Sequence, residues 1–304
     1  MEEVKILIIG GTGYIGRKLI EYIKINYSKF IIHSIYFQNK SHQFKDVKYL
    51  KCDITNLESL TNVLTEDYDY VINMAGYVDH RLINEGGFQI IDSHLIGLMN
   101  IIKTLSNKKL KKFIQIGSSD EYNDNHLFKD ENSKENPISP YSFSKTASTY
   151  FLQMLKNSEN FPVVVLRLFL VYGPDQDPNR FIPYIIENCI RNNKVEMTMC
   201  EQERDFTYID DILNGIMLAT LSESKITDNI VFNLASGVPI QINKVANLIY
   251  ENVRKGELLF GKKNYRKSES MRLVANNTKF KLHFNWKPLI GIEEGLLKTI
   301  NSYL

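Results

Sequence analysis

A tyrosine and a lysine four residues apart carry the clearest chemical signal in the sequence. Tyr141 and Lys145 open an amphipathic segment, 141–157, that predicts a helix, and residues i and i+4 of a helix share one face. An ammonium held beside a phenol stabilises the phenolate, so such a tyrosine can exchange a proton with a hydroxyl group. This spacing alone is common on surface helices. It becomes more specific because Ser118 and Ser119 end a predicted strand upstream and can add a hydroxyl to the pair.

Three glycines near the N-terminus have the spacing G-x-x-G-x-x-G. Gly10, Gly13 and Gly16 follow the apolar run Val4–Ile9 directly and open an amphipathic segment. In that context the first glycine permits a sharp turn, the second lets the backbone approach a pyrophosphate, and the third lets the helix pack against the strand. A turn that needs positive φ is the alternative, but the order strand, loop, helix favours dinucleotide binding. The predicted cofactor contacts here are Gly10, Thr12, Gly13, Tyr14, Ile15 and Gly16.

The type of dinucleotide is less sharply indicated. No acidic residue that would bind a ribose 2′-hydroxyl follows the second predicted strand, Phe30–Phe37, and Lys40 stands there instead. We therefore expect NADPH to be favoured and NADH to be possible, although Lys40 fits a solvated loop equally well. Asp53 is predicted either to reach the adenine or to cap a helix after Thr55. The other predicted cofactor contacts are Ile54, Ala75, Gly76, Tyr141 and Lys145.

Alternating short apolar runs and longer amphipathic segments predict a doubly wound parallel α/β sheet of the Rossmann type. We expect a dinucleotide-binding domain at 1–173, with 205–235 returning to it, and a smaller nucleotide-sugar lobe at 174–304. The pattern at 88–105 predicts one long helix, and 255–304 is expected to be polar and irregular. The other predicted elements are strands at Tyr68–Met74, Phe113–Ile116, Val163–Phe169, Val195–Met199 and Ile230–Leu234, and helices at Ile182–Asn192, Ile209–Leu221 and Ile242–Arg254.

Composition excludes several classes of protein. The 304 residues are 43% hydrophobic and 24% charged, and 37 basic residues nearly balance 35 acidic ones, so a core can form and bulk binding of nucleic acid is not expected. The 3 cysteines and 6 histidines form no metal-ligand or disulfide pattern, so we expect no metal and a reducing compartment. No signal peptide or membrane span is apparent, which predicts a cytoplasmic protein without a membrane partner.

Further motifs extend the pattern along nearly the whole chain. They are Asn73-Met74-Ala75-Gly76, Arg167 with Val171-Tyr172-Gly173-Pro174, Arg204-Asp205-Phe206-Thr207-Tyr208-Ile209-Asp210-Asp211 and Asn285-Trp286-Lys287-Pro288. Together with the glycine loop and the Ser-Tyr-Lys set, they resemble the extended short-chain dehydrogenase/reductases that modify nucleotide sugars. The resemblance implies that Tyr141 is the acid/base, that Lys145 is its electrostatic partner and a ribose ligand, and that Ser118, or its neighbour Ser119, orients the substrate oxygen. It also implies a homodimer through the helices that bear Lys145 and residues 88–105.

Three reactions share this scaffold in the family. A 4-epimerase oxidises C4 and reduces it again after the ketone has turned, a 4,6-dehydratase oxidises C4 and eliminates water from C5–C6, and a reductase consumes NAD(P)H to reduce a 4-keto-6-deoxy sugar. The segments Asn179–Ile186 and Val274–Asn277 are similar to the reductases, and Leu170 replaces an asparagine that contacts the diphosphate in many epimerases. We expect an NAD(P)H-dependent 4-keto-6-deoxyhexose reductase of surface-polysaccharide precursor synthesis. The alternatives are an epimerase, then a dehydratase, and outside enzymes an NAD(P)-binding sensor.

Charged side chains are the candidates for the nucleotide sugar, because arginine offers a permanently charged fork that matches phosphate oxygens. Arg204 lies in a family motif. The assignment of Arg266 rests only on its distance along the sequence from Val274–Asn277, and a surface position fits it nearly as well. Arg180 is a candidate for the sugar pocket. Asp120 fits either a dehydratase acid or a solvated loop, and the sequence leaves open whether His80 faces the sugar. The predicted substrate contacts are Ser118, Ser119, Asp120, Arg180, Arg204 and Arg266.

Overall fold

The computed structural model describes residues 3–38, 43–105, 110–122, 128–223, 229–265 and 269–304. The chain forms two compact units. The first comprises Met1–Asp124, Ser133–Arg167 and Gly215–Phe232, and the second comprises Asn125–Asn132, Leu168–Asn214 and Asn233–Leu304. The assignment of cofactor and sugar binding to separate parts of the chain stays a prediction.

A seven-stranded sheet in the order β10-β6-β5-β4-β1-β2-β3 forms the centre of the first unit. β1 pairs in parallel with both β2 and β4, β2 pairs in parallel with β3, and β4 with β5. The strand order therefore reverses direction between β1 and β4, which is where α/β sheets of this kind bind ligands. The strands are β1 Val4–Ile9, β2 Phe30–Tyr36, β3 Lys48–Lys51, β4 Tyr70–Asn73, β5 Lys112–Ser118, β6 Val163–Leu168 and β10 Val231–Leu234.

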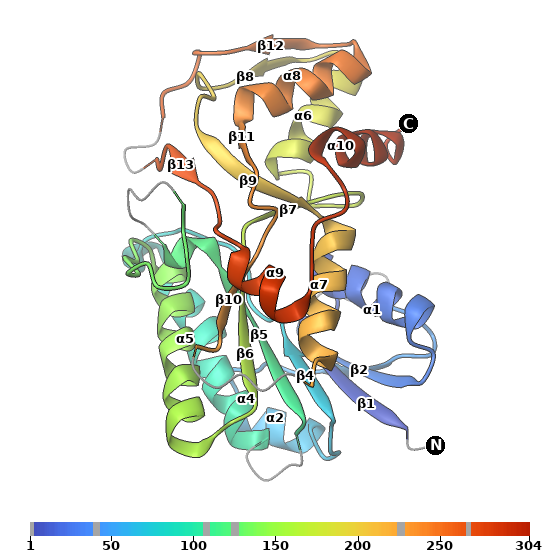
Figure 1. Cartoon of the computed structure of the whole chain (residues 1–304), viewed down its shortest axis with the longest axis vertical. Coiled ribbons are helices and arrows are strands. Elements are labelled where there is room, and N and C mark those ends of the chain that lie inside the picture. The colour runs from blue at the N-terminus through green and yellow to red at the C-terminus, as the bar shows by residue number, and fades with distance from the viewer. Residues whose placement is uncertain (1–2, 39–42, 106–109, 123–127, 224–228, 266–268) are drawn as a thin grey trace. The chain divides into compact units, whose positions relative to one another are not determined.

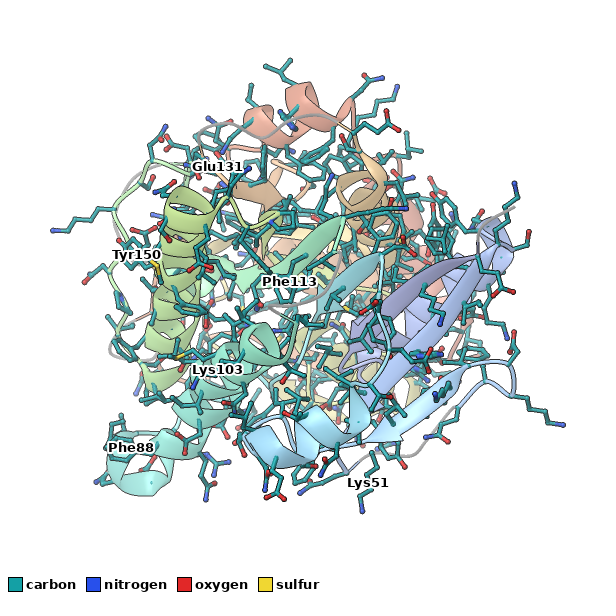
Figure 2. The ribbon with its side chains drawn as sticks, turned by 90° about the horizontal axis from the view of Figure 1, so that it is seen from below. Lys51, Phe88, Lys103, Phe113, Glu131 and Tyr150 are labelled. Carbon is teal, nitrogen blue, oxygen red and sulfur yellow. The ribbon has the colours of Figure 1, made fainter. Side chains whose placement is uncertain are left out.

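Helices cover both faces of this sheet because its strands are apolar on both sides. On one face, Leu60 of α2, Leu98 of α4 and Leu152 of α5 share a core with Leu7 and Phe113 of the sheet. Figure 1 shows α1 on the other side, and Figure 2 shows Phe113 inside the layers while Lys51 lies at the periphery. The helices of this unit are α1 Tyr14–Asn26, α2 Leu57–Val63, α3 Gly87–Ile91, α4 Gly97–Leu105, α5 Pro140–Glu159 and part of α7 Ile209–Leu221, with short 3₁₀ turns at Ile83–Glu85 and Ser119–Glu121.

The long helix predicted at 88–105 is interrupted. A π-helical turn at Asp92–Ile96 separates α3 from α4. Close packing accompanies the change, because a Cβ on Gly97 would lie 2.6 Å from Cδ1 of Ile54. The turn directs His94 into the interior, where its side chain is buried. Such π turns are frequent at functional sites.

The second unit contains a four-stranded sheet around β9 and a separate β8–β12 pair. β9 pairs antiparallel with β11 and parallel with β13 and β7. The expectation of an irregular C-terminus was wrong, because α9 and α10 form there. In α10 the buried Leu296, Thr299 and Ile300 recur at helical spacing between exposed charges. The elements are β7 Leu170–Tyr172, β8 Lys194–Glu196, β9 Glu203–Tyr208, β11 Pro239–Gln241, β12 Glu257–Leu259, β13 Arg272–Leu273, α6 Phe181–Ile190, α8 Ile242–Val253, α9 Thr278–Phe284 and α10 Ile292–Asn301.

Candidate active site

The glycine loop joins β1 to α1 with the geometry that a dinucleotide requires. Gly10 has φ +85°, and the amide of Gly13 donates to the Gly10 carbonyl at 3.1 Å. A Cβ on Gly16 would lie 2.4 Å from that same carbonyl oxygen, so a larger residue would push the helix off the loop. Among the described residues no side chain caps α1, and its first turn holds no acidic residue, which leaves its N-terminal amides suited to a pyrophosphate. Thr12 lies in this turn, and Tyr14 and Ile15 begin the helix.

The end of β4 is held against β5 by a side-chain amide. Asn73 donates to Gln115 Oε1 at 2.8 Å, and its Oδ1 accepts from the amide of Ala75 at 3.1 Å. Gly76 follows with φ +99°, and a Cβ there would overlap the imidazole of His94. The predicted cofactor residues Ala75 and Gly76 therefore lie on a backbone that is pressed closely onto a buried histidine.

Asp53 forms a local turn. Its Oδ1 accepts from the amide of Thr55 at 2.9 Å and from the Thr55 hydroxyl at 2.7 Å. The cap of α2 is Asn56, whose Oδ1 accepts from Ser59 N, so the alternative that made Asp53 the helix cap was wrong. The carbonyl of Ile54 accepts from Asn100 of α4 at 3.1 Å. Contacts of Asp53 and Ile54 with a cofactor stay predictions, and Lys40 lies outside the described residues.

Tyr141 and Lys145 lie at the start of α5 and are both buried. Ser139 caps the helix by accepting from Ser142 N at 3.1 Å, and Pro140 occupies its first position. Lys145 Nζ lies 5.8 Å from the centre of the Tyr141 ring and donates to the carbonyl of Ile116 at 2.9 Å. Burial lowers the pKa of Lys145 to about 8, although the negative charges of Glu121 and Asp120 act in the opposite direction. The helix start therefore holds an ammonium in a poorly solvated place beside a phenol.

Both candidate serines are buried at the end of β5. Ser118 Oγ accepts from the amide of Asp120 at 3.1 Å and caps the 3₁₀ turn Ser119–Glu121. Ser119 is the first residue of that turn. Burial does not separate the two, so the choice of Ser118 over Ser119 stays a prediction.

A buried charge network supports this strand end. Glu121 is fully buried and accepts from the amide of Ser118 at 3.0 Å, from Thr149 Oγ1 of α5 at 2.8 Å and from Arg167 Nε of β6 at 2.9 Å. Arg167 also pairs with Glu135 at 2.7 Å. Glu121 thereby ties β5 and β6 to α5, the helix that bears Tyr141. No sequence motif indicates a role for Glu121, because two of its three partners, Thr149 and Arg167, come from distant segments.

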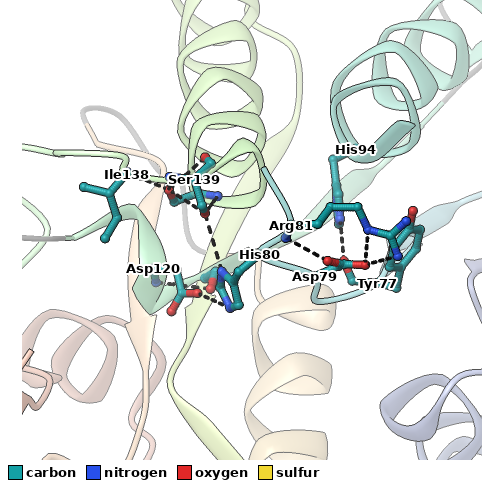
Figure 3. A network of polar contacts seen from close by, with 10 residues as sticks. Tyr77, Asp79, His80, Arg81, His94, Asp120, Ile138 and Ser139 are labelled. Atoms are coloured by element: carbon teal, nitrogen blue, oxygen red, sulfur yellow. Dashed lines mark hydrogen bonds and ion pairs between the residues drawn. The ribbon is translucent and has the colours of Figure 1, made fainter. Parts of the chain in front are cut away.

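Two histidines pack against the Tyr141 ring edge to face. The centre of the His94 ring is 5.2 Å from that of Tyr141, and that of His80 is 5.4 Å away. His94 Nε2 donates to the carbonyl of Tyr77 at 3.1 Å, and burial together with the charge of Lys145 lowers the pKa of His94 to about 3. Figure 3 shows the His80 ring between Asp120 and Ser139. No sequence motif marks His94, because the π turn that directs it inward is itself not apparent in the sequence.

Two of the three predicted arginines, Arg180 and Arg204, belong to the second unit. Arg204 is buried, donates to the carbonyl of Glu203 at 2.9 Å and pairs with Glu269. Arg180 is exposed and precedes α6 at its N-cap. Arg266 lies outside the described residues. Contacts of all three arginines with substrate therefore stay predictions.

The motif that contains Arg204 also organises the second unit. The fully buried Asp205 accepts from the amides of Ser236, Gly237 and Ala275 and from the Ser236 hydroxyl, at 2.6–3.2 Å. Asp211 accepts from two amides after Pro288, and its carbonyl accepts from the Trp286 indole at 3.2 Å. The two late motifs that the sequence analysis noted are thus bonded to each other through Asp211.

Within the described ranges, His, Cys, Asp and Glu side chains form no group of three or more that could hold a metal ion. Among the same residues, no helix combines the length and apolar character that crossing a membrane requires.

Several known proteins resemble this chain in sequence or in fold. Residues 6–235 match the model of a family described as NAD dependent epimerase/dehydratase. A UDP-glucuronate 4-epimerase of Thermodesulfobacterium geofontis is 28% identical over 319 aligned positions, which cover 97% of this chain and 94% of that protein. A CDP-abequose synthase of Salmonella typhimurium is 26% identical over 301 positions, covering 96% and 95%. The crystal structure of a Thermotoga maritima UDP-glucose 4-epimerase with UDP-glucose has a TM-score of 0.89 at 23% identity, covering 99% of this chain and 98% of its own, and shows the same fold.

Proposed function

This chain belongs to the NAD-dependent epimerase/dehydratase family, as its motifs predicted, and we propose that it reduces the C4 carbonyl of a nucleotide-linked 4-keto-6-deoxyhexose. The observation that carries the proposed chemistry at C4 is the buried pair at the start of α5. Lys145 holds its ammonium 5.8 Å from the centre of the Tyr141 ring, and its hydrogen bond goes to a backbone carbonyl. An ammonium placed in this way can stabilise the phenolate that remains after a proton is given up.

The chain's own residues supply the proton chemistry. Tyr141 donates its phenolic proton to the C4 oxygen as that oxygen becomes negative, and Lys145 compensates the charge that develops on the phenol. Ser118 donates a hydrogen bond to the same oxygen and polarises the carbonyl. A nicotinamide dinucleotide supplies the hydride when it is bound. The glycine loop fits such a dinucleotide, because Gly16 lets the helix pack closely on the loop and Gly13 lets the backbone approach a pyrophosphate.

Two features support the reductive direction and NADPH. β2 ends at Tyr36 and is followed by Phe37 and Gln38, so no carboxylate among the described residues there repels a 2′-phosphate. β7 begins with Leu170, where many epimerases carry a diphosphate-binding asparagine. The relative named CDP-abequose synthase supports a CDP-linked sugar as the first substrate to try.

A 4-epimerase is the second candidate. It is favoured by the names of the relatives from Thermodesulfobacterium geofontis and Thermotoga maritima. The same Tyr141, Lys145 and Ser118 would serve it, because both reactions move a proton and a hydride at C4. What differs is whether reduced cofactor is consumed or is regenerated within each turnover.

One experiment separates the two. Purified full-length protein is first assayed for cofactor that survives purification. NADPH and NADH oxidation is then followed with CDP- and dTDP-4-keto-6-deoxyglucose, and the products from UDP-glucose and UDP-glucuronate are identified without added reductant. Sugar-dependent loss of NADPH is the expected result. Tightly retained NAD with interconversion of the UDP sugars would replace the reductase by the epimerase, and the absence of both reactions would refute C4 chemistry on these sugars.

A further inference from the structure

His80 is held by residues from two other segments of the chain. It lies in the loop after β4, its Nε2 is 3.5 Å from Asp120 Oδ2 in the turn after β5, and its Nδ1 is 3.5 Å from Ser139 Oγ at the cap of α5. The ring also packs edge to face on Tyr141. Figure 3 shows this arrangement, in which Asp120 and Ser139 contact different nitrogens of the imidazole. All four residues belong to the first unit.

This arrangement gives the imidazole the features of a general base. A carboxylate at Nε2 favours the tautomer in which Nε2 carries the hydrogen, and that leaves a lone pair on Nδ1. The Ser139 contact at 3.5 Å is at the long limit of a hydrogen bond, so a substrate proton can replace it with little loss. The His80 side chain is 45% exposed, which lets its protons exchange with solvent.

The second histidine beside Tyr141 cannot serve in the same way. His94 is buried, and its Nε2 hydrogen is already donated to the Tyr77 carbonyl. Burial and the nearby Lys145 hold the pKa of His94 at about 3, so it stays neutral near pH 7. His80 is therefore the imidazole of the pair that is able to accept a proton.

We propose that His80, oriented by Asp120, is a second proton-transfer group of this site and exchanges a proton on a carbon next to the keto group of the sugar. The inference rests on the proposed function for the keto sugar as substrate. Protons on C3 and C5 are acidic because the C4 carbonyl accepts the electron pair that their removal releases. Tyr141 is proposed to act on the C4 oxygen, and His80 packs against its ring. The imidazole therefore faces the carbons next to C4.

The step involves no net oxidation. His80 Nδ1 takes the proton as the C–H bond breaks, the electron pair forms a C=C bond to C4, and the carbonyl π electrons move to the oxygen, which Tyr141 protonates. The reverse step returns a proton to carbon from an imidazolium that has exchanged with solvent. In D₂O the carbon therefore gains deuterium while the cofactor is unchanged.

The test measures this exchange directly. Full-length protein is incubated in D₂O with CDP- and dTDP-4-keto-6-deoxyglucose without reduced cofactor, and deuterium at C3 and C5 is followed by NMR against a sample without protein. We expect exchange by the unmodified protein and a loss of about 10²–10⁴-fold in His80→Asn, the range for a general base. Asp120→Asn is expected to lose exchange as well, because the imidazole then lacks its orienting carboxylate.

Asp79→Asn is the matched control. Asp79 lies beside His80 in the same loop, and its carboxylate accepts from Arg81 N and Nε. Within the described residues it makes no hydrogen bond or ion pair with His80 and acts on it only through its charge. It should keep the exchange rate within about twofold, which is the scatter expected of surface changes. His80→Gln is the second variant if His80→Asn does not fold, as judged by circular dichroism.

The outcomes separate this inference from the proposed function. No deuterium at C3 or C5 with either sugar, or full exchange in His80→Asn, overturns the inference. Exchange that is lost in Asp120→Asn and kept in His80→Asn also overturns it, because the carboxylate is then the base. Protein that exchanges deuterium without oxidising NADPH refutes the reductase alone, whereas NADPH oxidation without exchange refutes only the role of His80.

Discussion

Lys145 in the first unit and Arg204 in the second are both buried cations that the sequence marked for function, and the protein holds them differently. Within the described ranges Lys145 has no carboxylate in ion-pair contact, and its ammonium donates to the Ile116 carbonyl. Arg204 pairs with Glu269 and also donates to the Glu203 carbonyl. One charge is left to act on a neighbouring phenol, and the other is already compensated.

The difference shows under which conditions a buried charge can take part in a reaction. A charge removed from water without a contacting counter-ion is raised in free energy, and the reduced pKa of Lys145 reports that cost. Such a charge interacts strongly with any negative charge that develops nearby. A buried charge that is already paired contributes chiefly to holding its own surroundings. We therefore expect changes around Lys145 to affect rates and changes at Arg204 to affect binding and stability.

The largest expected effect is at Tyr141. Tyr141→Phe removes the proton donor and should lower turnover by about 10²–10⁴-fold, while cofactor retention stays unchanged. Tyr150→Phe on the same helix is the matched control, because its hydroxyl donates to Glu135 at an exposed position. Turnover by Tyr141→Phe at the level of Tyr150→Phe would refute the assignment.

The next largest effect concerns the charge network behind the pair. Glu121→Gln leaves the Arg167 charge with Glu135 alone, and losing one partner of a buried ion pair costs about 3–5 kcal/mol in the free energy of unfolding. Urea denaturation measures the change. Glu135→Gln, whose side chain is less buried, should cost less than half as much, and equal costs would contradict a special role for Glu121.

The pH profile tests the state of Lys145. Because its pKa is lowered to about 8, the ammonium loses its proton as pH rises through that value, and kcat/KM should fall on the alkaline side. Lys145→Arg should be about 10- to 10²-fold slower near pH 7, because the longer fork is misplaced. It should also lack the alkaline fall, since guanidinium stays charged. An unchanged alkaline limb in this variant would exclude Lys145 as its source.

The smallest effect is expected at Arg204. Arg204→Lys should leave kcat within about twofold and raise KM for the nucleotide sugar by up to about tenfold, which corresponds to about 1.4 kcal/mol. Steady-state kinetics separates the two parameters. If kcat of Arg204→Lys fell as much as that of Lys145→Arg, the contrast between the two cations would be wrong, because a paired cation would then contribute to the reaction rate.

Local patterns predicted much of the framework and part of the site. The glycine loop, the helix that begins at Tyr141 and the alternation of strands and helices follow from spacing within a few residues. The π turn at Asp92–Ile96 could not be predicted from local spacing. It accompanies close packing of Gly97 against Ile54, which belongs to another segment. Helix α10 was missed because its few buried residues lie among charges.

The sequence by itself determined the family, the doubly wound sheet and the Tyr141–Lys145 pair, because each depends on residues that are neighbours along the chain or on one helix face. Only the tertiary structure decided which charges are compensated and which histidines reach the phenol. Glu121 meets Arg167, and His80 meets Asp120 and Tyr141, only because parallel strands bring their carboxyl ends to one edge of the sheet. Burial and pairing are properties of that assembly, and they depend on contacts between segments that local spacing does not encode.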